Sequence, residues 1–239
     1  MRIVITSPPK TGNRWLKCLL SRIYELEVLH GKEKPPTKPD AFQAWAAEKF
    51  PDGTIFHQHC RFTPQLCDVI DGIPAHHVTI IRDPYDVFES TYYWVQAQAI
   101  HRAGRVRPTR PKNEIAGKAL DHPDVLAFLA NGFDLNLMRA EGWLRSGRTV
   151  VFRYEELRRD PMAELTRATD AIAPVDPRRI ADAIEECRAE NMRQRGKQSQ
   201  WHVSAAQVGE TREGLSEVHL AIFRERYADR IRELGYEVR

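Results

Sequence analysis

The first fifteen residues constrain the fold of this chain more than any other stretch. Arg2 to Thr6 reads as a short buried strand, because three β-branched aliphatic residues in a row are followed by Ser-Pro-Pro. Arg14 to Tyr24 then carries apolar residues at helical spacing, and the loop between the two holds Lys10 and Gly12. A strand that enters a helix through such a loop presents free backbone N–H groups and the positive end of a helix dipole. The segment therefore predicts a binding site for phosphate or sulfate, with Lys10 as a mobile cation.

This loop differs from the loop of nucleotide-triphosphate hydrolases, which needs G-x-x-x-x-G-K-[ST]. Lys10 precedes the only glycine of the segment, and although Thr11 follows it, the glycine frame is absent. A magnesium-dependent ATPase or kinase is therefore disfavoured. Taken alone, the loop is better explained as an ordinary turn with a solvated lysine.

A second strand ends at a residue suited to phosphate. Val78 to Ile81 is an apolar, β-branched run, and Arg82 follows it at the carboxyl end, where ligands bind in open α/β sheets. The planar fork of arginine favours bidentate phosphate contacts. Asp83 and Pro84 then predict the start of a helix, which carries Ser90 about two turns further on. Taken separately, Arg82 could serve an ion pair and Ser90 could be plain helix surface.

Three segments, in order, resemble the motifs of the sulfotransferases that use 3′-phosphoadenosine-5′-phosphosulfate (PAPS). Residues 7–15 are similar to the 5′-phosphosulfate loop, P-K-x-G-x-x-W, and residues 76–94 are similar to the 3′-phosphate motif with its Arg, D-P-x-D and Ser. Residues 150–161 resemble the strand and Y-E-D-L-x-x-D-P turn that follow. The resemblance implies the P-loop-related α/β fold of the cytosolic type. That fold has three α/β/α layers with a central parallel sheet, formed here by residues 1–239 as one domain.

The resemblance also implies the donor site. Its cofactor-binding residues would be Pro9, Lys10, Thr11, Gly12, Asn13, Arg14, Trp15, Arg82, Ser90, Tyr154, Gln194, Arg195 and Gly196. Among them, the aromatic rings would hold adenine, and the 3′-phosphate would be bound by the second and last motifs. PAPS would be the co-substrate and 3′-phosphoadenosine-5′-phosphate (PAP) the product.

The last of these motifs departs from the family pattern. Residues 194–201 resemble R-K-G-x-x-G-D-W, but Gln194 replaces the first arginine. Ala189 stands where the family often has an aromatic residue that stacks on adenine. Both changes predict weaker or altered donor binding.

Two histidines are candidates for the catalytic base. His57 and His59 flank Gln58 on the predicted strand Thr54 to His59, so both point to the same face. By its distance to Arg82, His59 takes the position of the family's catalytic histidine, and His57 remains the alternative. Histidine suits the role because its ordinary pKa lies close to neutral pH. A metal site at His-x-His-Cys is disfavoured, because no further ligand appears at a recognisable spacing.

The resemblance implies in-line transfer of a sulfuryl group to a hydroxyl, or an amine, of a small-molecule acceptor. Catalytic roles fall to His59 as base and Lys10 as stabiliser of the leaving phosphate, with no metal. Two alternatives remain: a magnesium-dependent nucleotide or small-molecule kinase, and a non-catalytic nucleotide-binding or docking module. The acceptor is not encoded in any motif, and residues 32–45 and 101–113 are the candidate acceptor loops.

Composition limits the partners and the setting. With 36 basic and 33 acidic residues the net charge is +3, which does not favour nucleic acid or an anionic membrane. No apolar run reaches transmembrane length, so we expect no membrane insertion. The four cysteines show no C-x-x-C pairing, which predicts reduced thiols, a cytoplasmic setting and no structural zinc. The oligomeric state stays open.

The remaining pattern alternates as a parallel sheet requires. A further strand is expected at 149–154, helices are expected at 64–70, 125–144, 162–172, 178–189 and 215–234, and loops at 32–39 and 101–113. The second loop has five basic residues from Arg102 to Lys112 and no acid. It is either a solvated, mobile loop or a lid or acceptor-docking segment that an anionic acceptor or the phosphates of the nucleotide would draw closed.

Overall fold

The computed structural model describes residues 1–29, 36, 38–101, 114–194 and 214–239. These residues form two compact units. The first unit contains Met1–Arg82 and Met138–Arg188, and the second contains Asp83–Leu137 and Ala189–Arg239. The predicted loop 101–113 lies outside the described residues except for His101, and so does most of the predicted loop 32–39.

The first unit is built on a five-stranded parallel sheet with the order β2-β3-β1-β4-β5. The strands are β1 (Arg2–Thr6), β2 (Glu27–Val28), β3 (Thr54–Gln58), β4 (His76–Ile81) and β5 (Val150–Arg153). The four longer strands were expected from their apolar runs, and the short edge strand β2 was not. The parallel α/β sheet predicted from the sequence is confirmed.

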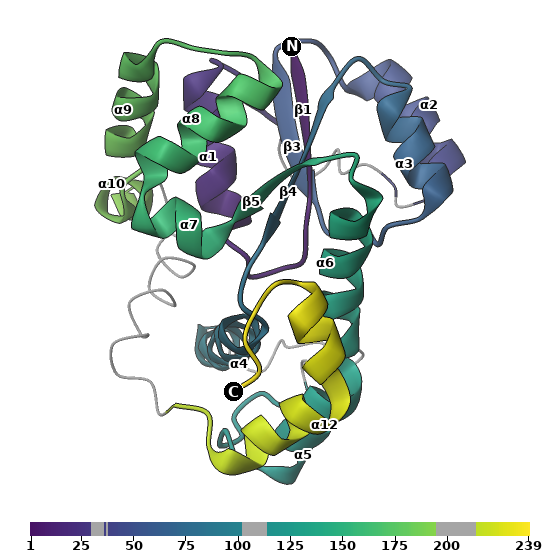
Figure 1. Cartoon of the computed structure of the whole chain (residues 1–239), viewed down its shortest axis with the longest axis vertical. Helices are drawn as coiled ribbons and strands as arrows, with labels where there is room; N and C mark the ends of the chain where they lie inside the picture. The colour runs from purple at the N-terminus through teal and green to yellow at the C-terminus, as the bar shows by residue number, and fades with distance from the viewer. Residues whose placement is uncertain (30–35, 37, 102–113, 195–213) are drawn as a thin grey trace. The chain divides into compact units, whose positions relative to one another are not determined.

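Helices cover both faces of this sheet (Figure 1). Ile3 and Ile5 of β1 face one layer, formed by α1 (Asn13–Ile23), α7 (Tyr154–Arg159), α8 (Pro161–Ile172) and α9 (Pro177–Glu186). Val4 points to the other face, which packs against α2 (Pro39–Lys49) and α3 (Pro64–Asp71). The alternation of side chains along β1 therefore supplies both cores, and the three-layer α/β/α architecture is confirmed.

Several of these helices begin by the same local rule. A polar residue caps the first turn and a proline follows at the first helical position, where its missing N–H is not needed. The Thr63 side chain accepts from the Leu66 N–H at 3.1 Å at the start of α3. The Asp160 carboxylate accepts from the Ala163 N–H at 3.0 Å at the start of α8. These caps fix the first residue of each helix.

The second unit is helical in its described part. It contains α4 (Pro84–His101), α5 (Pro123–Ala127), a π-helical turn η3 (Phe128–Gly132), α10 (Ala189–Gln194) and α12 (Glu217–Glu233). Helix α6 (Asp134–Ser146) starts in this unit and ends in the first. The Asp83 carboxylate accepts from the Tyr85 N–H at 2.8 Å, so Asp83 caps α4 as the sequence predicted.

The prediction of one continuous helix from 125 to 144 is wrong. The chain forms α5, η3 and α6 in succession, and the Phe133 N–H bonds to the Phe128 carbonyl at 3.0 Å, five residues back. The Phe128 ring also fills the space at Gly132, where an added Cβ would lie 2.6 Å from it. The spacing of the apolar residues does not reveal the π-helical turn, because the residues on either side of it keep a helical spacing. Helix α2 was likewise missed: its residues from Pro39 to Trp45 were assigned to a loop.

The prediction that all four cysteines are reduced is also wrong. Cys18 of α1 and Cys187 at the end of α9 form a disulfide, with their Cα atoms 6.1 Å apart, whereas Cys60 and Cys67 are free and buried. The pair is 169 residues apart, so it arises from the packing of α1 against α9 and leaves no mark on local spacing. Among the described helices, none is long and apolar enough to cross a membrane. The cytoplasmic setting stays a prediction.

Candidate functional site

The predicted site residues of the first unit follow the carboxyl ends of four neighbouring strands. The loop with Lys10 follows β1, His59 follows β3, Arg82 follows β4, and Tyr154 follows β5. Because these strands are parallel, all four positions lie at the same edge of the sheet. This edge is where open α/β sheets bind ligands.

The loop after β1 has an unusual backbone. Lys10 has a φ of 72° and Gly12, the N-cap of α1, has a φ of 96°. The left-handed conformation costs a non-glycine residue about 1–2 kcal/mol, so the surrounding structure must hold Lys10 in it. Among the described residues, no side chain caps the start of α1, and the first turn of this helix has no acidic residue. The first N–H groups of this helix have no intrahelical partner, so they present positive partial charge to an anion.

Buried side chains hold this loop from within. The Asn13 amide donates to the Pro8 carbonyl at 2.8 Å and to the Thr11 hydroxyl at 3.2 Å. The Thr11 hydroxyl donates to the same carbonyl at 3.0 Å, and the Ser7 hydroxyl donates to the Asn13 amide oxygen. Thr11 and Asn13 are therefore structural through their side chains, and only their backbone N–H groups are suited to bind a donor.

Arg82, Tyr154 and the loop after β1 are in direct contact. Arg82 Nη1 donates to the Lys10 carbonyl at 3.3 Å, and the Arg82 guanidinium carbon lies 4.4 Å from the centroid of the Tyr154 ring. The same ring packs on Gly12, where an added Cβ would lie 2.6 Å from Tyr154 Cδ2. Trp15 completes the group, with its ring centroid 6.2 Å from that of Tyr154 in an edge-on arrangement. Five predicted donor-binding residues thus form one cluster.

Burial affects two ionisable groups beside this cluster. It lowers the pKa of Arg14, because a half-buried guanidinium is less well solvated when charged, yet arginine remains protonated at neutral pH. Cys60, which follows His59, is almost fully buried, and burial raises the pKa of its thiol to about 12. Cys60 therefore stays a thiol at neutral pH and is unsuited to be a nucleophile.

His59 is oriented by the loop after β1. Its Nδ1 lies 2.9 Å from the Ser7 carbonyl oxygen. A carbonyl only accepts, so Nδ1 carries the proton, and in the neutral ring the lone pair is on Nε2. The His57 ring lies 5.5 Å from the His59 ring, which confirms that the two histidines share a face. In this tautomer Nε2 is the ring nitrogen that can accept a proton.

Five predicted donor-binding residues remain: Pro9, Ser90, Gln194, Arg195 and Gly196. Ser90 is buried on α4 and belongs to the second unit, as does Gln194, the last residue of α10. Pro9 is partly buried in the loop after β1. Arg195 and Gly196 lie outside the described residues. The roles of these five in donor binding stay predictions.

The sequence reasoning missed Ser7 and the structural role of Asn13. The register of β1 and β3 pairs Thr6 with Gln58, so the next residues, Ser7 and His59, are neighbours. That contact follows once the strand order is known, but a single sequence does not state which strands are adjacent.

No family model matches the chain, and no curated protein sequence matches it. Solved structures do: mouse sulfotransferase SULT7A1 complexed with PAP is 15% identical, with 98% of this chain and 87% of that chain covered and a TM-score of 0.64. A sulfotransferase domain from the curacin biosynthetic pathway is 12% identical, covering 99% and 98%, with a TM-score of 0.53.

A third match is retinol dehydratase in complex with androsterone and the inactive cofactor PAP. It is 13% identical, with 98% of this chain and 79% of that chain covered and a TM-score of 0.52. At such identities the likeness concerns the fold rather than the chemistry. Together with the sheet order and the cluster at its carboxyl edge, it shows that this chain has the fold of the PAPS-dependent sulfotransferases.

Proposed function

We propose that this chain is a sulfotransferase that moves a sulfuryl group from PAPS to a hydroxyl, or an amine, of a small-molecule acceptor. The observation that carries the proposal is the contact of Arg82 with both Tyr154 and the Lys10 carbonyl. It joins the 5′-phosphosulfate loop to the start of the 3′-phosphate motif. The solved structures with PAP bound support the choice of donor. We further propose that residues 1–239 act as one sulfotransferase domain.

Different residues of the cluster would bind different parts of PAPS. Lys10 and the first N–H groups of α1 would bind the 5′-phosphosulfate, because cation and helix dipole act on the same anion. Arg82 would bind the 3′-phosphate, and the rings of Trp15 and Tyr154 would hold adenine. For Ser90, Gln194, Arg195 and Gly196, a role at the 3′-phosphate rests on the motif resemblance alone.

Transfer needs a base and a stabiliser of the leaving group. His59 Nε2 would take the proton of the acceptor hydroxyl while the acceptor oxygen forms its bond to sulfur. As the bond from sulfur to the bridging oxygen breaks, negative charge grows on the departing phosphate. Lys10 and the α1 N–H groups would stabilise this charge without rearrangement, since the loop is already fixed by Asn13. No covalent intermediate with the protein is formed.

Two of the similar structures hold a small molecule as well as PAP and bear on the acceptor class. One similar structure is a complex of retinol dehydratase with androsterone and another is its complex with retinol, both small apolar alcohols. For this chain we propose a small-molecule hydroxyl or amine, with no nucleic acid as partner.

The direct test is transfer of labelled sulfate from PAPS to a panel of phenols, aliphatic alcohols, sugars and amines, with EDTA present. We expect transfer by the wild type and a fall in kcat of about 10²–10³ in Lys10→Ala. Lys49→Ala, an exposed lysine at the end of α2, serves as the control and should leave kcat unchanged. Magnesium-dependent phosphorylation of acceptors by ATP would contradict the proposal and favour a kinase. Binding of PAP without any transfer would favour a docking module.

A further inference from the structure

Three metal-ligating side chains meet on the sheet face opposite α1, and the proposed transfer reaction uses none of them. The Cys67 sulfur, a carboxylate oxygen of Asp71 and a ring nitrogen of His77 all lie within 4.8 Å of one another. Cys67 and Asp71 are four residues apart on α3, so they share one face of that helix. His77 comes from the adjoining strand β4. The three residues belong to the first unit.

His77 supplies a second, independent observation. It is 7% exposed, and its Nε2 lies 2.7 Å from the Thr6 hydroxyl. Its other ring nitrogen, Nδ1, is buried without a hydrogen-bond partner. Buried polar atoms in folded proteins almost always have a partner, so an orphaned ring nitrogen requires an explanation. A histidine held by a hydrogen bond at one nitrogen, with a lone pair at the other, is the usual arrangement of a metal ligand.

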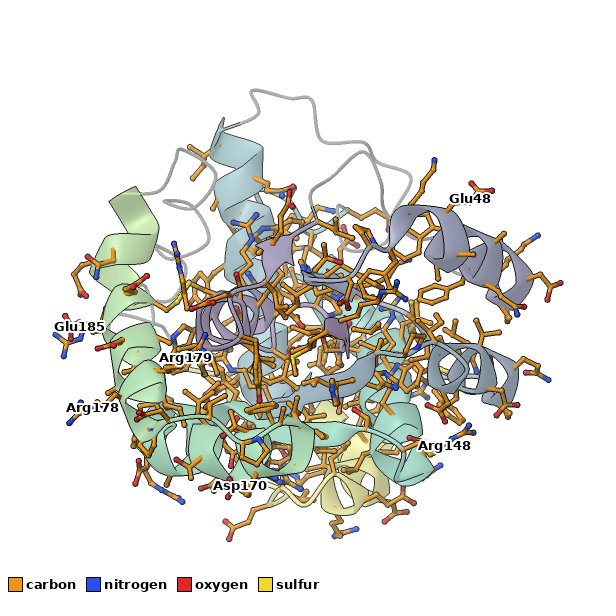
Figure 2. The ribbon with its side chains drawn as sticks, turned by 90° about the horizontal axis from the view of Figure 1, so that it is seen from above. Glu48, Arg148, Asp170, Arg178, Arg179 and Glu185 are labelled. Atoms are coloured by element: carbon orange, nitrogen blue, oxygen red, sulfur yellow. A yellow bond between two sulfur atoms is a disulfide. The ribbon has the colours of Figure 1, made fainter. Side chains whose placement is uncertain are left out.

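The side chains of Cys67 and Asp71 are also suited to bind a metal ion. Cys67 is fully buried and free, so its sulfur is not used in a disulfide. The Asp71 side chain is 36% exposed, which leaves a path from solvent to the cluster. Arg148, labelled in Figure 2, lies in the loop between α6 and β5 and pairs with Asp71, its Nε lying 2.6 Å from Oδ2. It also donates to Asp68 at 2.8 Å.

We propose that Cys67, Asp71 and His77 bind a divalent transition metal, with zinc as the ion that best fits one sulfur, one oxygen and one nitrogen ligand. Water would complete the four ligands that zinc prefers. Ligand atoms around a tetrahedral zinc lie roughly 3.5 Å apart, so the three side chains must draw together on binding. The Cys67 thiol would lose its proton to solvent, and His77 would bind through Nδ1.

The ion pair between Arg148 and Asp71 should affect the affinity for the metal ion. Its guanidinium neutralises Asp71 in the metal-free protein, and a cation at that position repels an incoming metal ion. Replacing Arg148 by glutamine should therefore tighten metal binding, even though it removes an ion pair. If the ion pair alone were the purpose of this cluster, the substitution would leave metal affinity unchanged.

Cobalt(II) is the probe, because a thiolate bound to it gives a charge-transfer absorption in the near ultraviolet. The protein is used tag-free and without reductant, so that Cys18 and Cys187 remain paired. We expect the band in the wild type, its displacement by zinc, and its loss in Cys67→Ser. Cys60→Ser is the matched control, since Cys60 is the other buried free thiol, and the band should persist there.

Two results would overturn the site: no band in the wild type, or a band that survives in Cys67→Ser. If Cys67→Ser fails to fold by circular dichroism, two partly exposed positions carry the test instead. The apparent Kd for cobalt should rise about tenfold or more in Asp71→Asn and should fall in Arg148→Gln. Unchanged Kd values in both variants would equally overturn the proposal. Sulfuryl transfer is not part of the readout, so this result is independent of the proposed function.

Discussion

The guanidinium of Arg82 stacks over the Tyr154 ring, with 4.4 Å between the guanidinium carbon and the ring centroid. This contact joins the ends of β4 and β5, and the bond from Arg82 to the Lys10 carbonyl extends it to the loop after β1. One arginine thus connects the ends of three strands. A cation held in this way needs little further ordering to bind the proposed 3′-phosphate.

Replacing Arg82 by lysine keeps the charge but removes the planar fork and the stacking on Tyr154. Loss of a cation–π contact and of a bidentate hydrogen bond should raise the Kd for PAP roughly 10–100-fold. Isothermal titration calorimetry measures this change. Arg178→Lys, at an exposed position on α9 (Figure 2), is the control and should bind PAP like the wild type. Equal affinity in Arg82→Lys and the wild type would remove Arg82 from the donor site.

Gly12 is required for two reasons that can be separated. Gly12→Ala would strain a φ of 96° and drive a Cβ to within 2.6 Å of the Tyr154 ring. Gly53 has a φ of 77° but nothing within 4 Å of an added Cβ, so Gly53→Ala introduces the backbone strain alone. We expect both variants to lose about 1 kcal/mol of stability from the strain, and only Gly12→Ala to lose PAP binding as well. Denaturant unfolding and calorimetry give the two values. Normal PAP binding by Gly12→Ala would show that the close approach of Tyr154 is not needed.

Substitutions of Asn13 test whether PAP binding depends on the hydrogen bonds inside the loop after β1. Asn13→Asp keeps the size of the side chain but loses the amide that donates to Pro8 and Thr11. It also places a buried carboxylate beside the anion site. We expect weaker PAP binding in Asn13→Asp than in Asn13→Ala, and a loss of roughly 1–3 kcal/mol of stability in each, because buried polar partners are left unsatisfied. If Asn13→Asp binds PAP as tightly as Asn13→Ala, the anion does not lie near this residue.

The disulfide between Cys18 and Cys187 should contribute to stability by restricting the unfolded chain. Reduction, or the double variant Cys18→Ala with Cys187→Ala, should cost roughly 2–5 kcal/mol and lower Tm on the order of 10 °C. Differential scanning calorimetry with and without dithiothreitol measures the effect, and the double variant should no longer respond to the reductant. Alkylation of both thiols in the native, unreduced protein would show instead that the pair is not bonded.

The sequence predicted those parts of the fold that depend on local pattern. The apolar runs at Arg2–Thr6 and Val78–Ile81 became neighbouring strands, and the start of α4 at Pro84 followed from local capping rules. The break at Phe128–Gly132 was missed, because it depends on a ring that packs over a glycine. The disulfide and the His77 cluster were missed for a related reason: each joins residues that only tertiary packing brings together.

The same division holds at the site. Lys10 and Gly12 could be named from their loop and Arg82 from its place at a strand end, whereas Trp15 could be named only from the resemblance to the family's motif. The stacking of Arg82 on Tyr154 and the bond from His59 to Ser7 could not be named, since both require the order of strands in the sheet.

The most direct test of the account is calorimetric titration of the wild type and of Arg82→Ala with PAP, and separately with ATP and magnesium. We predict that PAP binds the wild type without metal, that Arg82→Ala loses most of this affinity, and that ATP with magnesium does not substitute for PAP. Binding of ATP with magnesium but not of PAP would contradict the account and identify the site as that of a kinase.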